Sequence, residues 1–229
     1  MSRFIVCEHE QGTEGWFADR MGRVTGSKAD CVFAEGKGNQ EAFTRADYRM
    51  ALVLENITRK PMEPDFKQTR EMAWGNEQEP TARMRFEMEK GIDVGQSGFV
   101  YLKRTRAGCS VDGWLKDSGR QGILEIKCPK SKTHYAWLLD GRAPLEYMPQ
   151  IIHNLWVTGA EFCDFMSFDP RMPRELQEFY VRVERDQKAI DKHEAGVLQF
   201  LAEVDRDEKR MRQLIEERKK PVIEEDVFV

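Results

Sequence analysis

The stretch "CSVDGWLKDSGRQGILEIKCP", Cys109 to Pro129, carries two acidic residues and a lysine around a polar turn that contains glycine. Residues 122–129 and 107–115 have the composition of strands, and 116–122 is rich in turn-forming residues. The stretch therefore predicts two antiparallel strands joined by a turn, and with them the core of a sheet.

Strand alternation places the charged side chains of this stretch. Glu125 and Lys127 point to one face, whereas Ile126 points to the opposite, packing face. If 107–115 is the antiparallel neighbour, Asp112 can approach Glu125. Two adjacent carboxylates repel unless a cation neutralises them, and oxygen ligands select Mg²⁺ or Mn²⁺. The pattern fits a metal site, but taken alone it favours a solvated hairpin face with a Glu–Lys ion pair, because short acidic patterns recur by chance.

Composition indicates a globular protein. The chain has 229 residues, 40% of them hydrophobic and 33% charged, which suits one large domain with a packed core. No apolar run approaches the ~20 residues that cross a bilayer, and the first 16 residues do not resemble a signal peptide, so we expect a cytoplasmic protein. Five scattered cysteines lack zinc-like spacing, which predicts reduced thiols.

Charge is distributed unevenly. The net charge of −4 does not favour nucleic-acid binding, but residues 101–150 hold nine basic and five acidic residues. A DNA-processing enzyme needs a local positive surface rather than a high overall pI. Random scatter of charge would explain the same count, so charge alone leaves DNA binding open.

Periodicity predicts the order of the elements. Helices are expected at 29–34 (capped by Thr25 or Ser27), 41–58, 70–90, 131–140, 145–158 and 187–218. Strands are expected at 98–105, 107–115, 122–129, 162–170 and 176–185. Helices followed by a short mixed sheet and further helices indicate an α/β or α+β fold.

Several blocks carry a family resemblance. "CSVDG…LEIKCP" resembles the core of the PD-(D/E)xK nuclease superfamily, and more closely that of the phage lambda exonuclease or YqaJ-type viral recombinase family. Three further blocks resemble that family in the same order, and they are "GWFADRMGRVTGS" (15–27), "AWGNEQEPTARMRFE" (73–87) and "YMPQIIHNLWVTGAEFCDFMSFDPRM" (147–172). The chain departs from the superfamily at Val111, where proline is frequent.

The resemblance implies an α/β fold with a restriction-endonuclease-like PD-(D/E)xK core, in which helices flank a mixed central β-sheet. It further implies that residues 1–229 form a single nuclease domain. The helix at 187–218 would pack on that core or lie at a subunit interface.

The resemblance also assigns a catalytic centre. Asp112, Glu125 and the backbone carbonyl of Ile126 match metal ligands, and Lys127 matches the catalytic lysine. Lys127 would orient or help deprotonate the attacking water. Mg²⁺, two ions per site, is the implied cofactor, and Mn²⁺ would substitute for it.

Two further residues match family positions around the centre. Glu79 matches a helix acid that helps to hold a metal-bound water. Glu77 is its rival, but residues two apart do not share a helix face, so only one can point to the site. Gln150 matches a glutamine that contacts the nucleophilic water or the lysine; otherwise it is a helix-surface amide.

Arg20, Ser27 and Ser110 match a pocket for the 5′-phosphate of a DNA end. A guanidinium with hydroxyl donors near a helix start suits a terminal phosphate. Met72 occupies the place of an apolar wedge that would separate the two bases of the terminal base pair. Lys37 could reach a DNA groove from a loop. Methionine more often fills a core position, and a lysine in such a loop is more often simply solvated.

The tryptophans and histidines receive no functional role. Trp16 and Trp74 are expected to anchor the core. His134, His153 and His193 do not have the spacing of metal ligands.

By resemblance, the chain is a Mg²⁺-dependent exonuclease that degrades one strand of linear duplex DNA from 5′ to 3′. It would release mononucleotides and leave a 3′ overhang for a single-strand-annealing protein. Relatives form ring-shaped homotrimers and serve phage or prophage recombination in a bacterial host. The alternatives are a structure-specific or other PD-(D/E)xK endonuclease, or a non-enzymatic DNA-end-binding protein.

Overall fold

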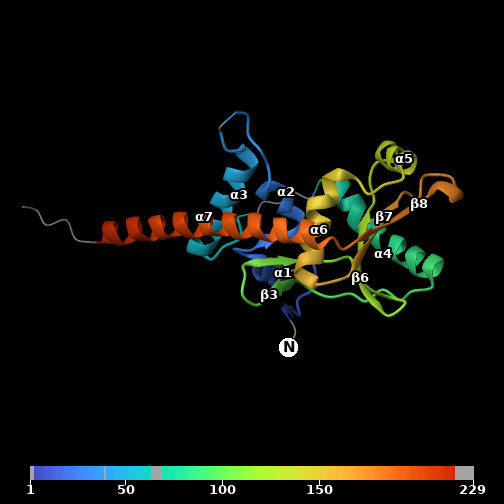
Figure 1. Cartoon of the computed structure of the whole chain (residues 1–229), viewed down its shortest axis with the longest axis horizontal. Helices are drawn as coiled ribbons and strands as arrows, with labels where there is room; N and C mark the ends of the chain where they lie inside the picture. Colours follow the sequence, from blue (N-terminus) through green and yellow to red (C-terminus); the bar gives the residue numbers. More distant parts are fainter. Residues whose placement is uncertain (1–2, 39, 63–68, 220–229) are drawn as a thin grey trace, which may run out of the picture.

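The computed structural model describes residues 3–38, 40–62 and 69–219, in which helices surround two small sheets (Figure 1). The strands are β1 (Phe4–Val6), β2 (Val24–Thr25), β3 (Val100–Leu102), β4 (Ala107–Cys109), β5 (Gly113–Asp117), β6 (Arg120–Lys127), β7 (Phe162–Phe168) and β8 (Glu178–Glu184). The α-helices are α1 (Glu14–Arg20), α2 (Ala29–Val32), α3 (Phe43–Thr58), α4 (Arg70–Lys90), α5 (Ser131–Asp140), α6 (Met148–Thr158) and α7 (Gln187–Lys219). Three 3₁₀ turns are η1 (Gly26–Lys28), η2 (Leu145–Tyr147) and η3 (Arg174–Leu176).

The central sheet has the order β5-β6-β7-β8. Its β6–β7 pair is parallel, and the β5–β6 and β7–β8 pairs are antiparallel, so the sheet is mixed as predicted. Ser118 and Gly119, with φ of 50° and 85°, form the two-residue turn between β5 and β6. Positive φ at both positions gives the turn the twist that antiparallel strands need, and glycine adopts it without strain. The predicted hairpin is confirmed.

A second mixed sheet has the order β1-β3-β4-β2. The single strand predicted at 107–115 is wrong, because β4 belongs to this second sheet and β5 to the central one. The chain changes sheet at 110–112. Asp112 Oδ2 accepts a hydrogen bond from the backbone N–H of Ile126 at 2.7 Å. A side chain thus satisfies a β6 donor where the ladder with β5 ends, and the strand need not continue.

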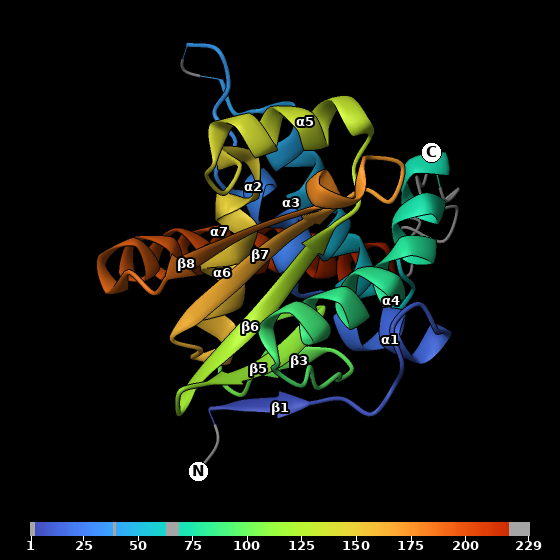
Figure 2. The ribbon, with the colours of Figure 1, turned by 90° about the vertical axis from the view of Figure 1, so that its right-hand side faces the viewer.

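Helices cover both faces of the central sheet (Figure 2). On one face α4 packs Ala82 and Phe86 against Leu124 and Ile126 of β6. On the other, α5, α6 and α7 pack against a larger core that contains Ile123 and belongs to both sheets. The α6-side residues of β6 are therefore Ile123, Glu125 and Lys127, as the alternation predicts.

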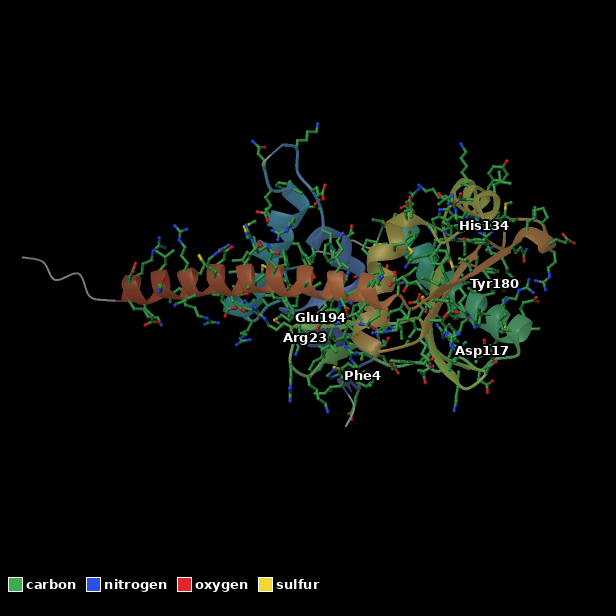
Figure 3. The ribbon with its side chains drawn as sticks, viewed as in Figure 1. Phe4, Arg23, Asp117, His134, Tyr180 and Glu194 are labelled. Carbon is green, nitrogen blue, oxygen red and sulfur yellow. The ribbon has the colours of Figure 1, made fainter. Side chains whose placement is uncertain are left out.

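Two residues mark opposite ends of the central sheet (Figure 3). Asp117 lies at the β5–β6 turn and pairs with Arg182 of β8 at 2.7 Å. His134 of α5 lies near the other end, where its ring nitrogens are 2.7 Å from Ser167 Oγ and 2.8 Å from the Leu176 carbonyl oxygen. Side-chain hydrogen bonds thus tie both ends of the sheet.

The N-terminal region differs from the prediction. Helix α1 is an unpredicted element, capped by Thr13, whose Oγ1 accepts the Trp16 N–H at 3.3 Å. Neither Thr25 nor Ser27 caps the following helix as predicted, because η1 intervenes and moves the N-cap of α2 to Lys28. Helix α2 ends at Val32 rather than at residue 34.

Helix α7 is buried over its first half only. Its buried side chains run from Ile190 to Val204, against α3 and α6. Arg45 of α3 pairs with Glu203 at 2.8 Å beside this seam. Polar contacts with α3 continue further along the helix, where Asn56 Nδ2 donates to Glu208 Oε2 at 2.9 Å. The C-terminal end of α7 extends away from the body of the molecule (Figure 1). In the described part of the chain, every helix is too short or too polar to span a membrane.

A buried histidine pair joins three elements. His153 of α6 has Nε2 3.1 Å from the Gly108 carbonyl oxygen in β4, and Nδ1 3.0 Å from Nε2 of His193 in α7. Since a carbonyl only accepts, His153 donates from Nε2 and His193 donates to His153 Nδ1, with both rings neutral. Burial lowers the pKa of His153 to about 3 and that of His193 to about 4.

The histidine pair predicts acid sensitivity. In the unfolded chain these histidines bind protons near pH 6.5, whereas in the folded chain they stay neutral down to about pH 4. The free energy of unfolding therefore falls as pH drops through this window. His193→Gln keeps a donor for His153 but removes one titrating group. We expect it to reduce the pH dependence of the unfolding free energy by roughly 1.4 kcal/mol per pH unit between pH 6 and 4.5. Urea unfolding followed by circular dichroism measures this, and parallel curves for variant and wild type would contradict it.

Candidate functional site

The site is built around the carboxylate of Glu125, near the end of β6. This side chain is 1% exposed. Its Oε1 accepts hydrogen bonds from Lys127 Nζ at 2.5 Å and Gln150 Nε2 at 2.6 Å, and its Oε2 accepts from Asn154 Nδ2 at 3.1 Å. A carboxylate buried this deeply is stable only when hydrogen bonds and charge replace the lost water, and β6 and α6 supply both.

Asp112 lies beside Glu125. Gly113 pairs with Leu124, so Asp112 comes at the next position along the β5–β6 ladder, opposite Glu125. Its hydrogen bond to the N–H of Ile126 fixes its carboxylate at the end of β6. The structure therefore brings together the three residues predicted as metal ligands.

Negative charge accumulates at this point. The pKa of Glu125 is raised to about 7; burial is the largest cause, Asp112 and Glu79 add to it, and Lys127 opposes it. Burial also raises the pKa of Asp112, against the opposing charges of Lys127 and Arg83. The folded chain thus holds carboxylates whose ionisation is unfavourable without a further cation.

Lys127 is held as a cation. Burial alone would lower its pKa, but the charges of Glu125 and Asp112 raise it above the usual lysine value. Its Nζ also lies 4.9 Å from the ring centroid of Tyr147, which favours the charged form. In this arrangement the charged form of Lys127 donates a hydrogen bond to Glu125 Oε1.

Of the two candidate glutamates on α4, Glu79 is the one that lies near Asp112 and Lys127. Glu77 is exposed, whereas Glu79 is half-buried and close enough to Asp112 and Lys127 to interact with both. Burial and then the charge of Asp112 raise the pKa of Glu79. Arg83, one turn along α4, pairs with Glu79 at 2.6 Å and directs it.

The three residues predicted to bind phosphate form a second cluster. Arg20 Nη2 lies 3.4 Å from Ser27 Oγ, and its guanidinium carbon lies 4.1 Å from the ring centroid of Trp16. Trp16 Nε1 donates to Ser110 Oγ at 2.9 Å. Trp16, predicted only as a core residue, thus joins Arg20 to Ser110.

The two clusters are adjacent. Cys109 is buried between them: burial and the charge of Glu125 raise the pKa of its thiol, and the charge of Arg20 lowers it. Ser110 and Asp112, two residues apart where the chain changes sheet, bring one member of each cluster into a single segment.

Met72 and Lys37 lie in neither hydrogen-bonded cluster. Met72 is 40% exposed in the first turn of α4, about two helical turns before Glu79. Lys37 is exposed in the loop between α2 and α3. Trp74 lies two residues after Met72. The guanidinium carbon of Arg171 lies 4.5 Å from the centroid of the Trp74 ring, which links this end of α4 to the loop after β7.

Sequence reasoning missed Asn154. It follows Gln150 by four residues, so helical periodicity alone places both on one face of α6. That spacing could have identified it. Tyr147 and Arg83 were missed as well, and they become visible only when tertiary structure brings them to Lys127 and Glu79.

The donor set fits a hard divalent cation. Among residues 3–38, 40–62 and 69–219, no three or more His, Cys, Asp and Glu side chains form a metal-binding group. The candidate ligands predicted from the sequence are two carboxylates and the Ile126 carbonyl. Mg²⁺ commonly takes one or two carboxylates and keeps several waters. Such an ion would offset the negative charges of Asp112 and Glu79, which add to burial in raising the pKa of Glu125.

A mixed sheet that carries this acid–acid–lysine group at one end, between helices, defines a PD-(D/E)xK nuclease fold. Residues 15–161 match the YqaJ-like viral recombinase domain, and the chain belongs to that family. All eleven predicted site residues fall within the matched range.

Solved structures support the assignment. An alkaline exonuclease of Laribacter hongkongensis, LHK-Exo, is 33% identical with a TM-score of 0.79, and the match covers 90% of this chain and 99% of that one. A structure of LHK-Exo in complex with dAMP is 32% identical over the same shares, with a TM-score of 0.80. A phage-related exonuclease of Haemophilus somnus 129PT, at 14% identity and a TM-score of 0.61, covering 82% of this chain and 96% of its own, shares the fold.

One curated relative also matches. The ExoD protein of Escherichia coli (strain K12) is 36% identical over 59 residues, which cover 26% of this chain and 67% of that protein.

The charge cluster predicts a stability effect. Asp112→Asn removes one buried charge and keeps an oxygen that can accept the Ile126 N–H, so the metal-free chain should gain about 1 kcal/mol. Mg²⁺ or Mn²⁺ should raise the melting temperature of the wild type but not of this variant. Thermal unfolding with and without metal tests both statements. A less stable metal-free variant, or one that metal still stabilises, would contradict this account of Asp112.

Proposed function

We propose that the chain is a Mg²⁺-dependent exonuclease that degrades one strand of linear duplex DNA from 5′ to 3′. One observation carries this proposal: the acid–lysine site and the Arg20 cluster are joined through Ser110 and Asp112. An arrangement that binds a terminal phosphate beside a hydrolytic site suits an enzyme that works from an end.

Each residue of the acid–lysine site has a defined task in this proposal. Asp112, Glu125 and the Ile126 carbonyl would hold Mg²⁺, two ions in all, or Mn²⁺ in its place. The bound ions would supply an activated water and neutralise charge on the phosphate. Lys127, as a cation, orients the water and stabilises the developing negative charge, which gives it an electrostatic role.

Two further side chains support that centre. Gln150 holds Glu125 Oε1 together with Lys127, which sets the direction of the carboxylate. Glu79, which accepts a hydrogen bond from Arg83, would help to hold a metal-bound water from its position on α4.

The Arg20 cluster would select the DNA end. Arg20 offers charge and paired N–H donors, and Ser27 and Ser110 offer hydroxyl donors to a 5′-phosphate. Met72, exposed near the start of α4, would act as the wedge at the terminal base pair. Lys37 would contact the duplex from its loop.

The wider context follows by analogy with the family. The products would be mononucleotides and a 3′ overhang, on which a single-strand-annealing protein loads during phage recombination. Residues 1–229 would act as one nuclease domain in a ring-shaped homotrimer, with α7 on the core or at a subunit interface. Enclosure of the duplex by a ring would explain processive digestion.

Digestion of end-labelled duplex tests the polarity. With Mg²⁺, a label at the 5′ end should leave as a mononucleotide early, while a label at the 3′ end of the same strand should be retained until late. Lys127→Met keeps the length of the side chain but loses its charge, and activity should fall by about 100-fold or more. Cleavage of covalently closed circular duplex would favour an endonuclease. Tight end binding without cleavage would favour a non-enzymatic end-binding protein.

Two glutamates of α4 provide a matched control. Glu79→Gln should reduce cleavage, whereas Glu77→Gln should leave the rate near that of the wild type, since Glu77 is exposed. Equal losses in the two variants would remove Glu79 from the site.

The Arg20 cluster predicts end preference. The rate on 5′-phosphorylated ends should exceed that on 5′-hydroxyl ends, and Arg20→Gln should reduce this ratio by roughly tenfold or more, since hydrogen bonds to charged groups are strong. Arg104→Gln, which removes an exposed positive charge elsewhere, is the control. An unchanged ratio in Arg20→Gln would remove Arg20 from the phosphate pocket.

A further inference from the structure

Asn154 is a buried amide that serves Glu125 together with Gln150. The two residues lie one turn apart on α6, and each donates to a different oxygen of the carboxylate: Gln150 to Oε1 at 2.6 Å and Asn154 to Oε2 at 3.1 Å. Asn154 is only 1% exposed. With both oxygens held, the carboxylate cannot rotate about its last bond without breaking a hydrogen bond.

The other side of the Asn154 amide touches Gly26. A Cβ atom built on Gly26 would lie 2.1 Å from Asn154 Oδ1, far inside van der Waals contact. Among the described residues, this oxygen is one of the few buried side-chain atoms without a hydrogen-bond partner. Exchanging the amide's oxygen and nitrogen would set two acceptors against each other at Glu125, so the donor requirement of Glu125 determines this orientation.

Gly26 belongs to the other cluster. It begins η1 and directly precedes Ser27, whose hydroxyl lies beside Arg20. Its φ is not positive, so the absent side chain serves the close approach of Asn154 rather than an unusual backbone conformation. Asn154 is therefore in direct contact with a carboxylate of one cluster and the backbone of the other.

A core-filling role alone does not explain asparagine here. A leucine of similar size would fill the space without burying an unpaired oxygen, which is unfavourable. Replacing Asn154 with leucine would, however, remove the hydrogen-bond donor to Glu125 Oε2.

We propose that Asn154 is a positioning residue that sets the metal-ligating carboxylate of Glu125 relative to the phosphate pocket at Ser27. This inference rests on the proposed function. Asn154 acts through Glu125 on one side and Gly26 on the other, and it touches neither DNA nor metal.

The experiment measures Mn²⁺ binding by calorimetry without DNA, and then the cleavage rates on 5′-phosphate and 5′-hydroxyl ends. Outer residues that orient a metal ligand commonly change affinity by about 10–100-fold. Asn154→Leu and Asn154→Ala should therefore weaken Mn²⁺ binding by about tenfold or more, and reduce the 5′-phosphate preference. Thr158→Val is the matched control. It removes two buried hydrogen bonds one turn further along α6, one from Thr158 Oγ1 to the Asn154 carbonyl and one from the Ala160 N–H to Thr158 Oγ1, and should leave Mn²⁺ affinity unchanged.

Gly26→Ala provides a second route that leaves Asn154 itself intact. The added methyl group should displace the amide and weaken Mn²⁺ binding, although Gly26 does not contact Glu125. In Gly26→Ala/Asn154→Ala the clash is absent, so the double variant should bind Mn²⁺ no more weakly than Asn154→Ala. Such non-additivity is the signature of one shared contact.

The outcomes separate the two levels of the proposal. A wild-type chain that binds no Mn²⁺ would overturn both the proposed function and this inference. Wild-type binding with unchanged affinity in Asn154→Leu and Asn154→Ala would overturn the inference alone. Equal loss of Mn²⁺ affinity in Thr158→Val would also overturn it, because general loosening of α6 would then explain the effect.

Discussion

Burial of one carboxylate constrains the whole central sheet. Glu125 points into the α6 side of β6 among apolar neighbours, where an isolated negative charge would be strongly unfavourable. Three donors compensate, two of them amides on α6 and one the neighbouring lysine. The register of β6 and the rotation of α6 must both be right for these contacts to form. The geometry of the proposed site and correct packing are therefore one requirement here.

The carboxylates around Glu125 also oppose folding through their mutual repulsion. Asp112 approaches Glu125 where the chain crosses between sheets, and Glu79 approaches it from α4. After burial, both charges raise the pKa of Glu125, and the charge of Asp112 raises that of Glu79. Like charges that approach one another oppose folding, whereas the cation binding proposed for this site would make use of them. The histidine pair is the neutral counterpart: it joins α6, α7 and β4 without adding charge.

Much of the fold and part of the site could be predicted from residue patterns. Alternation in β6 predicted that Glu125 and Lys127 share a face, and periodicity predicted α4 with its bounds of 70–90. The fold class is confirmed. The splitting of 107–115 between two sheets was not predictable locally, because it depends on a hydrogen bond from Ile126 to Asp112. The contact between Asn154 and Gly26 likewise joins segments far apart in sequence. The roles of the site residues stay predictions, since geometry shows proximity but not chemistry.

The crossing of the chain between sheets has a consequence for length. Ser110 and Asp112 are two residues apart, so their Cα atoms cannot be separated by more than about 7 Å. In the proposed function, the distance between end recognition and bond cleavage is therefore set by the backbone, and no side-chain replacement can extend it. Point substitutions at Ser110 or Asp112 would alter how strongly the 5′-phosphate or the metal ion is bound. Only an inserted or deleted residue alters how far apart the two events take place along a strand.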